Sequence, residues 1–389
     1  MKAILGAQIL KRDEILENHV LIFDEAVQSI ESEVDYKKRF ESSTVDIKEY
    51  HFKGILVPGF IDIHIHGSMG HDVMDASEEA LQSISSSILK SGTTSFLATT
   101  MTMSQSEIEG SLEAIQLFME HQENEFSFKK VNGARLIGAH LEGPFINPAY
   151  KGAQNEKHVQ KPSRDWIDPH IKTIKMITLA PEMDEGFKFT KSLKDTDIVL
   201  AIGHSGCDYE TALEAFDEGF HHITHCFNAM TGLHHRRPGV VGAALTKPFT
   251  LDIIADGIHI HPDFMGPFAK LKGIQQTILI TDAMRAAMMP EGEYSLGGQN
   301  VIVKEGCCRL DDGTLAGSVL SMDQALRNLL EKSDLNIYEI IRMLSENPAR
   351  RLGLFSEIGS LEVGKKADIV LLDESYQIAR VFVNGELTD

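Results

Sequence analysis

The middle of the chain alternates short apolar runs with longer segments in which apolar residues recur at helical spacing. Each run has the length and composition of a buried parallel strand. The segments between them, such as residues 77–92 and 208–219, begin with polar residues that can cap a helix and end at glycine. Eight runs follow one another, at residues 55–66, 93–100, 136–143, 174–182, 198–205, 222–230, 251–260 and 276–284. This order predicts an α/β fold built on a TIM-like (β/α)8 barrel.

Two parts of the chain depart from this pattern. Residues 285–318 combine glycines with β-branched residues, which predicts a hairpin inserted after the eighth strand and lying over the barrel mouth. Both chain ends have the pattern of short strands separated by turns. We therefore predict a small β-sandwich domain formed by residues 1–57 together with 358–389, packed against a catalytic barrel of residues 58–357.

Composition and charge narrow the range of functions. The 389 residues carry a formal charge of -20, from 37 basic and 57 acidic side chains, which disfavours a nucleic-acid partner. The apolar runs are shorter than the roughly 20 residues of a membrane-spanning helix. The N-terminus has charged residues where a secretory signal needs an unbroken apolar stretch. We expect a cytoplasmic protein, not bound to membranes, that acts on a small molecule.

The four cysteines predict neither a zinc ribbon nor a disulfide framework. They are Cys207, Cys226, Cys307 and Cys308, and their spacing matches neither type of site. Cys226 follows His225 directly, but neighbouring residues on a strand point to opposite faces. We therefore expect Cys226 to pack in the core, as free cysteines commonly do.

Side chains that can bind metal stand at the ends of the predicted strands. His64 and His66 are two residues apart on the first strand, so both imidazoles project to the same side and can meet one ion. The C-terminal ends of barrel strands converge on one mouth, where barrel enzymes hold their catalytic residues. Four more side chains of this kind end the third, fifth, sixth and eighth strands: Glu142, His204, His225 and Asp282.

These six imidazole and carboxylate groups predict a metal centre. Such ligands suit zinc, iron, manganese or cobalt. Glu142 can bridge two ions, and His64 with His66 can hold a second ion, so we expect two divalent ions per chain. Taken singly, Glu142 could instead cap a loop, His204 could bond the following turn, and Asp282 could cap a helix. The position of Asp282 opposite the histidines favours a catalytic base.

Several motifs resemble those of the amidohydrolase superfamily. PGFIDIHIHG, HLEGPF, GHS, THCFNAM and TDAM occur here in the order found in that superfamily. Within it, the longer segments HLEGPFINPAYKGAQN, HCFNAMTGLHHRRPG, ADGIHIHP and GTLAGSVLSM resemble the family of N-acetylglucosamine-6-phosphate deacetylases. The similarity covers almost the whole chain.

This resemblance implies a metal-dependent hydrolase that removes the acetyl group of an amino-sugar phosphate by means of a metal-activated water. It implies that Glu142, His204 and His225 hold the principal ion and that Asp282 transfers the proton. Some members lack the histidine pair and use a single ion, whereas His64 and His66 match the members with two. The substrate contacts that it implies are Ala153, Gln154, Asn228, Ala229, Arg236, His259, Leu315, Ala316 and Gly317.

Phosphate recognition is expected from Arg236. This residue belongs to the basic run 234–237, which is unusual in so acidic a chain, and a guanidinium suits bidentate phosphate binding. A solvated loop is the other interpretation of this run. The resemblance also implies a homodimer, in which the loop would reach the neighbouring active site.

Other functions stay open at this point. Within the superfamily, the substrate could be N-acetylgalactosamine 6-phosphate or a cyclic amide, because epimer preference depends on a few pocket contacts. In a different class, the barrel could be a non-catalytic scaffold, since a fold does not by itself guarantee an activity. The complete set of metal ligands argues against the scaffold. A serine nucleophile is disfavoured because GHSG at residues 203–206 lacks the G-x-S-x-G spacing.

Overall fold

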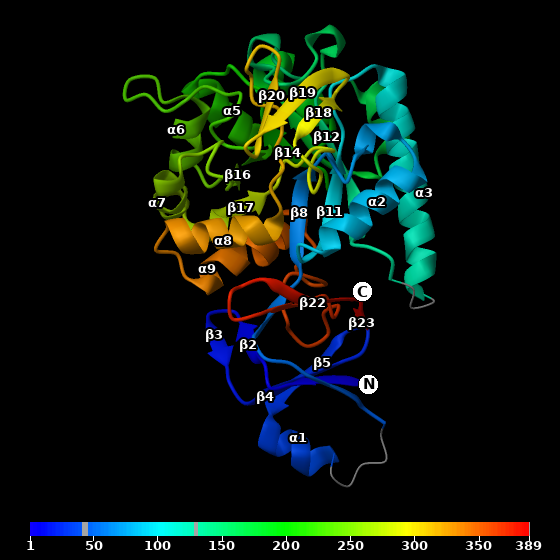
Figure 1. Ribbon diagram of the computed structural model, residues 1–389. Helices are drawn as coiled ribbons and strands as arrows, with labels where there is room; N and C mark the ends of the chain where they lie inside the picture. Colours follow the sequence, from blue (N-terminus) through cyan, green and yellow to red (C-terminus); the bar gives the residue numbers. More distant parts are fainter. Residues whose placement is uncertain (41–45, 128–130, 389) are drawn as a thin grey trace.

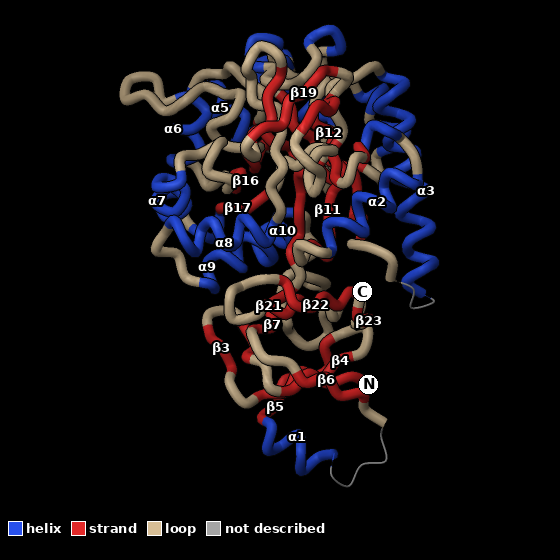
Figure 2. Tube along the Cα trace, viewed as in Figure 1, coloured by secondary structure: helices blue, strands red, loops and turns tan. Residues whose placement is uncertain are grey.

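The computed structural model describes residues 1–40, 46–127 and 131–388. The chain forms a barrel surrounded by helices and, below it in Figure 1, a smaller unit made mostly of strands that contains both chain ends. Figure 2 shows that the helices lie around the barrel strands. Among the described residues, no helix combines the length and the apolar character that crossing a bilayer requires.

Eight parallel strands form the barrel in sequence order around one sheet. Ile65 at the end of the first strand bridges to Ala283 after the last one, and this bridge closes the ring. The predicted fold class is therefore confirmed. The strands are β8 (Phe60–Ile65), β11 (Thr93–Thr99), β12 (Arg135–Glu142), β13 (Ile174–Leu179), β14 (Val199–Ile202), β15 (Phe220–Ile223), β16 (Thr250–Ile254) and β17 (Thr277–Ile280).

Most of the strands end earlier than the apolar runs that predicted them. The sixth run extends to residue 230, yet β15 ends at Ile223. Beyond it, His225, Phe227 and Ala229 have φ of 33°, 84° and 50°, which no strand allows. The apolar character of these run ends reflects burial in the loops of the mouth.

Helices α2 and α5 begin at their predicted capping residues, whereas only α5 ends at its predicted glycine, since α2 already ends at Leu89. Ser77 accepts a hydrogen bond from the backbone N–H of Ala80 at the start of α2, and Asp208 accepts one from Thr211 at the start of α5. Gly219, with a φ of 129°, ends α5. The barrel helices are α2 (Glu78–Leu89), α3 (Gln105–Ser127), α4 (Lys188–Ser192), α5 (Tyr209–Glu218), α6 (Gly239–Thr246), α7 (Pro262–Lys272), α8 (Met322–Lys332), α9 (Ile337–Ile341) and α10 (Asn347–Arg351).

Several connections contain short helical turns or a two-stranded ribbon. The ribbon pairs β9 (Gly67–Ser68) with β10 (His71–Asp72). The turns are η1 (Val73–Asp75), η2 (Pro148–Tyr150), η3 (Glu156–His158), η4 (Arg164–Trp166), η5 (Asp168–His170), η6 (Pro181–Met183), η7 (Glu185–Phe187), η8 (Ile274–Gln276) and the π-helical η9 (Arg342–Glu346).

The smaller unit packs a four-stranded sheet against a six-stranded sheet, in the orders β5-β4-β1-β6 and β23-β22-β21-β7-β2-β3. Buried side chains such as Ile4, Phe23, Leu56 and Phe382 fill the space between them. The strands are β1 (Lys2–Leu5), β2 (Gln8–Lys11), β3 (Glu14–Leu16), β4 (His19–Phe23), β5 (Val27–Ser32), β6 (Lys48–His51), β7 (Ile55–Pro58), β21 (Ile369–Leu372), β22 (Ile378–Val383) and β23 (Glu386–Leu387).

The first segment of the chain contributes to both of these sheets. Gly6, with a φ of 78°, turns the backbone between β1 in one sheet and β2 in the other. A short helix, α1 (Glu33–Phe40), was not predicted. The boundaries at residues 57 and 358 stay a prediction, and residues 41–45 and 389 of that predicted domain lie outside the described residues.

The insertion after the eighth strand lies over the barrel mouth, at the top of Figure 1. It is a three-stranded antiparallel sheet, and we call residues 292–317 the flap. A single hairpin was predicted, but the tight turn at Glu305 and Gly306 adds a third strand. Its strands are β18 (Gly292–Leu296), β19 (Gln299–Lys304) and β20 (Cys307–Leu310).

An ion pair joins the barrel to the β unit. Arg135 at the start of β12 contacts Asp368 with 2.7 Å between Nη1 and Oδ2. The two side chains are only 12% and 4% exposed. Asp368 also accepts a hydrogen bond from the backbone N–H of Asn384. The pair is therefore largely shielded from water. Loss of one partner would leave the other charge buried and poorly hydrated.

We expect Arg135→Leu to lower the free energy of unfolding by about 3 kcal/mol, because Asp368 would remain buried without its cation. Arg39→Leu is the matched control, since Arg39 pairs with Glu31 at 3.1 Å while 56% exposed. That exposed pair should contribute less than about 1 kcal/mol. Urea denaturation followed by circular dichroism measures both, and equal losses would contradict a special role for the junction.

Candidate metal centre

All six predicted metal ligands lie together at the C-terminal ends of the barrel strands. His64 lies in β8 with His66 directly after it, and Glu142 ends β12. The other three, His204, His225 and Asp282, are the second residues after β14, β15 and β17. Each of the six is buried or nearly so. The barrel therefore brings these side chains into one enclosed site.

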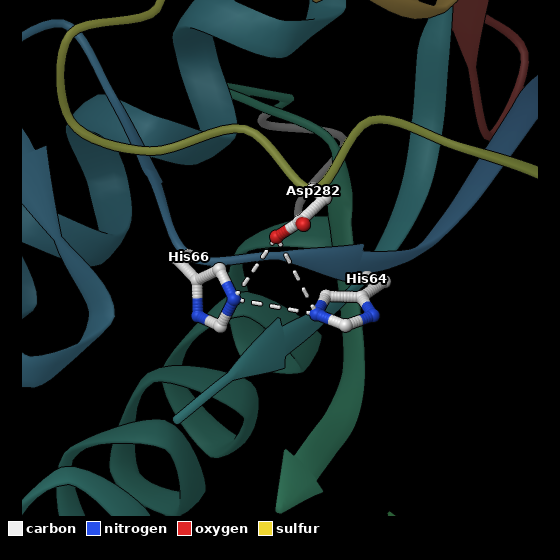
Figure 3. A group of neighbouring side chains, drawn as sticks. All are labelled: His64, His66 and Asp282. Carbon is white, nitrogen blue, oxygen red and sulfur yellow. Dashed lines mark hydrogen bonds and ion pairs between the residues drawn. The ribbon is translucent and has the colours of Figure 1, made fainter. Parts of the chain in front are cut away.

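One group of donors consists of His64, His66 and Asp282 (Figure 3). The two imidazoles turn their Nε2 atoms toward each other at 3.3 Å. Asp282 Oδ1 lies 3.2 Å from Nε2 of His66 and 3.6 Å from Nε2 of His64. Three potential ligand atoms, from residues on or just after the first and last barrel strands β8 and β17, thus face a common point.

The second group consists of Glu142, His204 and His225. Oε1 of Glu142 lies 3.2 Å from Nε2 of His204 and 3.0 Å from Nε2 of His225. The two Nε2 atoms are 3.2 Å apart. Glu142 also lies 3.3 Å from Nε2 of both His64 and His66, so its carboxylate stands between the two groups.

The separations suit divalent metal ions. Two nitrogen ligands about 2.0–2.1 Å from one tetrahedral ion are about 3.3 Å apart, which matches the Nε2 pairs in both groups. The other ring nitrogen of His66 lies 3.1 Å from the carbonyl oxygen of Thr99, and that of His204 lies 3.1 Å from the carbonyl oxygen of Tyr150. A carbonyl at Nδ1 requires the proton there and leaves the Nε2 lone pair for a metal.

Three of the candidate ligands have a left-handed backbone. The φ angles are 47° at His204, 33° at His225 and 49° at Asp282. Non-glycine residues seldom adopt such angles, and those that do cluster at functional sites. The conformation turns each side chain from the strand end toward the barrel axis.

Buried polar residues hold these strained loops in place. Asp252 accepts a hydrogen bond from the backbone N–H of His225 and contacts His222 at 2.9 Å. Asp62 accepts hydrogen bonds from the backbone N–H of His64 at 3.2 Å and from the hydroxyl of Thr281 at 2.6 Å. The residues on either side of the mouth are thereby tied to the barrel interior.

Sequence reasoning missed this supporting layer. Asp62 and His140 each lie two residues before a ligand, His64 and Glu142, on the same strand. Alternation along a strand places such pairs on the same side, which here is the barrel interior. His140 is fully buried, stacks edge-to-face on the His64 ring, and contacts the Thr178 hydroxyl at 2.7 Å. Polar residues two positions before a ligand are the signal that could have found them.

Charge balance at the site favours ionised carboxylates beside basic nitrogens. Burial raises the pKa of Glu142, but the surrounding imidazoles hold that pKa well below its usual range. Burial lowers the pKa of His225, but Glu142, together with Asp282 and Asp252, outweighs burial and raises it to about 9. Protons and a metal ion compete for these nitrogens, so metal binding must release protons.

A pocket of about 220 Å³ opens above the metal ligands. It is closed on one side by the flap through Leu296 and Thr314. Seven predicted substrate residues line it: Ala153, Gln154, Asn228, Ala229, His259, Leu315 and Gly317. The prediction did not include four others: Met101, Gly152, Leu296 and Thr314.

Two of the predicted substrate residues do not line this pocket. Arg236 lies exposed on its loop, where its guanidinium contacts His235 at 2.7 Å. Ala316 is fully buried in the flap core, and its backbone N–H donates to the carbonyl of Cys308. Leu315 and Gly317 flank it and line the pocket. Neighbours in an extended segment point to opposite sides, so Ala316 faces away.

Gln154 and His259 have their polar groups partly committed within the protein. Gln154 donates from Nε2 to Glu142 at 2.7 Å and accepts at Oε1 from the backbone N–H of Thr102. Gln154 therefore orients the carboxylate that joins the two donor groups. Nδ1 of His259 contacts Asp256 at 2.7 Å, which leaves Nε2 as the ring nitrogen for a ligand.

Comparisons with known proteins agree with this geometry. Residues 55–388 match the model of the Amidohydrolase family. The chain is 38% identical to the N-acetylglucosamine-6-phosphate deacetylase of Bacillus subtilis (strain 168), over 97% of this chain and 95% of that protein. It is 37% identical to the N-acetylgalactosamine-6-phosphate deacetylase of Escherichia coli O157:H7, over 86% and 87%. The crystal structure of N-acetylglucosamine-6-phosphate deacetylase from Pasteurella multocida superposes with a TM-score of 0.91 at 26% identity, covering 100% and 99% of the two chains.

We expect Glu142→Ala and His204→Ala to lose most of the bound metal and His64→Ala to lose only part, because two ions shared between the two donor groups would be held unequally. His259→Ala is the control, since it changes the pocket outside both donor groups. Elemental analysis of the purified variants measures the metal content. A wild-type content near one ion per chain would reject the two-ion site and leave His64 and His66 as supporting residues.

Proposed function

This chain belongs to the amidohydrolase family, and on that premise we propose that it hydrolyses N-acetylglucosamine 6-phosphate to glucosamine 6-phosphate and acetate. The observation that carries this proposal is the buried set of four imidazoles and two carboxylates beneath a pocket closed by the flap. Relatives with this activity match nearly the full chain. The reaction is a step in the catabolism and recycling of amino sugars.

Two divalent ions fit the donor arrangement. We assign one to Glu142, His204 and His225, and the other to His64, His66 and Asp282. Zinc, iron, manganese and cobalt all accept these ligands. Such an ion, when bound, lowers the pKa of a bound water from 15.7 to about 7 and so supplies a nucleophile at neutral pH.

Asp282 is the proton carrier of the reaction. Burial raises the pKa of Asp282, but His64 and His66 outweigh burial and leave the pKa below its usual value. The carboxylate is therefore ionised at neutral pH and can accept the proton of the attacking water. It then donates that proton to the amine nitrogen as the amide bond breaks, which makes the amine an acceptable leaving group.

The pocket residues position the sugar. Asn228 donates its amide to the carbonyls of His225 and Cys226, so its amide oxygen remains for a substrate hydroxyl. His259 is held by Asp256 and presents one ring nitrogen. Ala153, Leu315 and Gly317 supply the closely fitting wall. Specificity for a sugar rather than a general amide follows from this combination of fixed polar groups and a tight wall.

Phosphate binding by Arg236 requires a second subunit. The loop of Arg236 lies outside the pocket of its own chain, and large apolar side chains beside the loop and the pocket are exposed: Leu233 at 58%, Ile258 at 38% and Phe264 at 44%. Exposed apolar area of this kind is typical of an interface. We propose a homodimer in which Arg236 reaches the neighbouring pocket.

The cytoplasm is the proposed compartment of this activity. All four cysteines are unpaired, and Cys207, Cys226 and Cys308 are buried. Thiols in this state suit a reducing compartment. Cys226 lies in the barrel core and belongs to neither donor group, in agreement with the packing role expected for it.

Acetate release from purified protein tests the proposed activity. N-acetylglucosamine 6-phosphate should be hydrolysed faster than N-acetylgalactosamine 6-phosphate, which is the second candidate because a relative at 37% identity carries that name. A higher kcat/KM for the galactosamine epimer would make N-acetylgalactosamine 6-phosphate the preferred substrate. The absence of release from either sugar in the metal-loaded protein would contradict the deacetylase function.

We expect Asp282→Asn to lose at least about a hundredfold in kcat while it keeps most of its metal, because an amide cannot accept the proton of water. Asp263→Asn is the control, since Asp263 is 85% exposed on α7. Steady-state kinetics and elemental analysis decide the outcome together. Normal turnover in Asp282→Asn would assign the proton transfer to another group.

We expect Arg236→Ala to lower kcat/KM for N-acetylglucosamine 6-phosphate by about tenfold to a few hundredfold, the scale of one or two charge-assisted hydrogen bonds. Hydrolysis of unphosphorylated N-acetylglucosamine should hardly change. Arg237→Ala, in the same exposed loop, is the matched control. Equal losses on both substrates would show that Arg236 shapes the loop instead.

Mixed dimers test whether Arg236 acts between subunits. Arg236→Ala and Asp282→Asn subunits, each impaired alone, should give more activity on N-acetylglucosamine 6-phosphate when combined than the two variants give separately. One site in such a dimer has an intact Asp282 and an intact arginine from its partner. The absence of recovery in a verified mixed dimer would place Arg236 within its own site.

A further inference from the structure

A second and larger cavity lies at the opposite end of the barrel from the metal ligands. It measures about 990 Å³, against about 220 Å³ for the pocket at the mouth. Its floor is formed where the barrel strands begin, by residues such as Arg135, Lys175 and Val199. Lys366 and Asn384 of the β unit form the facing side. We call this cavity the base groove.

Arg351, the last residue of α10, lines the base groove with an incompletely paired guanidinium. Its Nη1 donates to the carbonyl oxygen of His221 at 3.1 Å. Its Nε is buried and has no hydrogen-bond partner among the described residues. Burial lowers the pKa of Arg351, and no carboxylate offsets this effect. A shielded charge without a counter-ion is costly, so the position favours an anion.

Lys175 adds a second positive charge to the same groove. It is half-buried at the start of β13 and makes no ion pair within the described part of the chain. The other three cations of the lining are already matched, because Arg135 pairs with Asp368, Arg350 with Glu346, and Lys366 with Glu357. The carboxylates of the lining are all exposed: Glu25, Glu123, Asp197 and Glu357. The half-buried part of the groove is therefore positive.

Apolar side chains form another part of the wall. Met119, Phe126, Leu352 and Leu354 line the groove and are each half-buried. The Phe126 ring carries the Arg135 guanidinium at 5.2 Å from its centroid. A ligand of this groove would thus contact apolar surface as well as cationic groups. Inorganic ions alone would leave that surface unused.

We propose that the base groove binds a small organic phosphate monoester, with its phosphate at Arg351, its organic part against the apolar wall, and Lys175 adding positive charge to the same groove. A phosphate monoester carries about -1.5 to -2 charges at neutral pH, whereas a carboxylate carries only one. The two unmatched cations of the groove therefore favour a phosphate over a carboxylate. The site is separate from the deacetylase pocket, because one lies at the beginnings of the barrel strands and the other at their ends.

Calorimetric titration with phenyl phosphate tests this proposal, with benzoate as the carboxylate analogue of similar shape. Phenyl phosphate should bind the wild-type protein at least about tenfold more tightly than benzoate. Arg351→Gln should weaken binding by about tenfold to a hundredfold, and Lys175→Gln by a smaller factor. Lys172→Gln is the matched control, since Lys172 is exposed and outside the groove. Arg351→Lys, which keeps the charge, should retain part of the affinity.

The active site must be excluded as the source of the signal. His259→Ala alters the pocket at the mouth and should leave groove binding unchanged, while Arg351→Gln should keep the wild-type kcat for deacetylation. Unfolding temperatures with and without phenyl phosphate provide a second readout, because a bound ligand stabilises the native state. Wild-type affinity in Arg351→Gln, equal binding of benzoate, or loss of the signal in His259→Ala would each overturn the proposal.

Discussion

Glu142 is the contact on which the arrangement of the barrel mouth depends. Its two carboxylate oxygens lie 3.0–3.3 Å from the Nε2 atoms of four histidines that come from three strands and their loops. Without a negative charge between them, these imidazoles would face one another in a site shielded from water. The carboxylate therefore permits two ligand groups to share one small volume, and Gln154 fixes its orientation.

The rest of the barrel is adapted to this concentration of charge. Barrel interiors are usually filled by branched apolar side chains. Here the layer beneath the ligands contains Asp62, His140, His222 and Asp252, all buried and hydrogen-bonded. These polar groups contribute less to stability than apolar packing would, but they determine the backbone conformation of the loops that carry the ligands. The positions of the side chains at the mouth are thus fixed by hydrogen bonds in the barrel interior.

Local patterns in the sequence predicted the barrel and the six candidate metal ligands that it brings together, because strand periodicity and position at a strand end are both local properties. Contacts between segments distant in the sequence were harder to predict. The apolar runs extended too far at β15, because burial in a loop has the same composition as burial in a strand. The family resemblance placed Arg236 among the substrate contacts, in a loop expected to reach a neighbouring subunit, and in one chain that residue is exposed. Arg351 was missed because the lack of a counter-ion becomes visible only in three dimensions.

The six-stranded sheet of the β unit determines when β7 can pair with all of its neighbours during synthesis. β7 precedes the barrel in the chain, yet one of its two sheet neighbours is β21 (residues 369–372), which follows the barrel. Leu56 and Val57 of β7 are fully buried in the finished protein. Until β21 has been synthesised, this apolar strand has an unpaired edge that is open to wrong pairing. The edge of β7 therefore stays without this partner while the whole barrel between the two strands is synthesised.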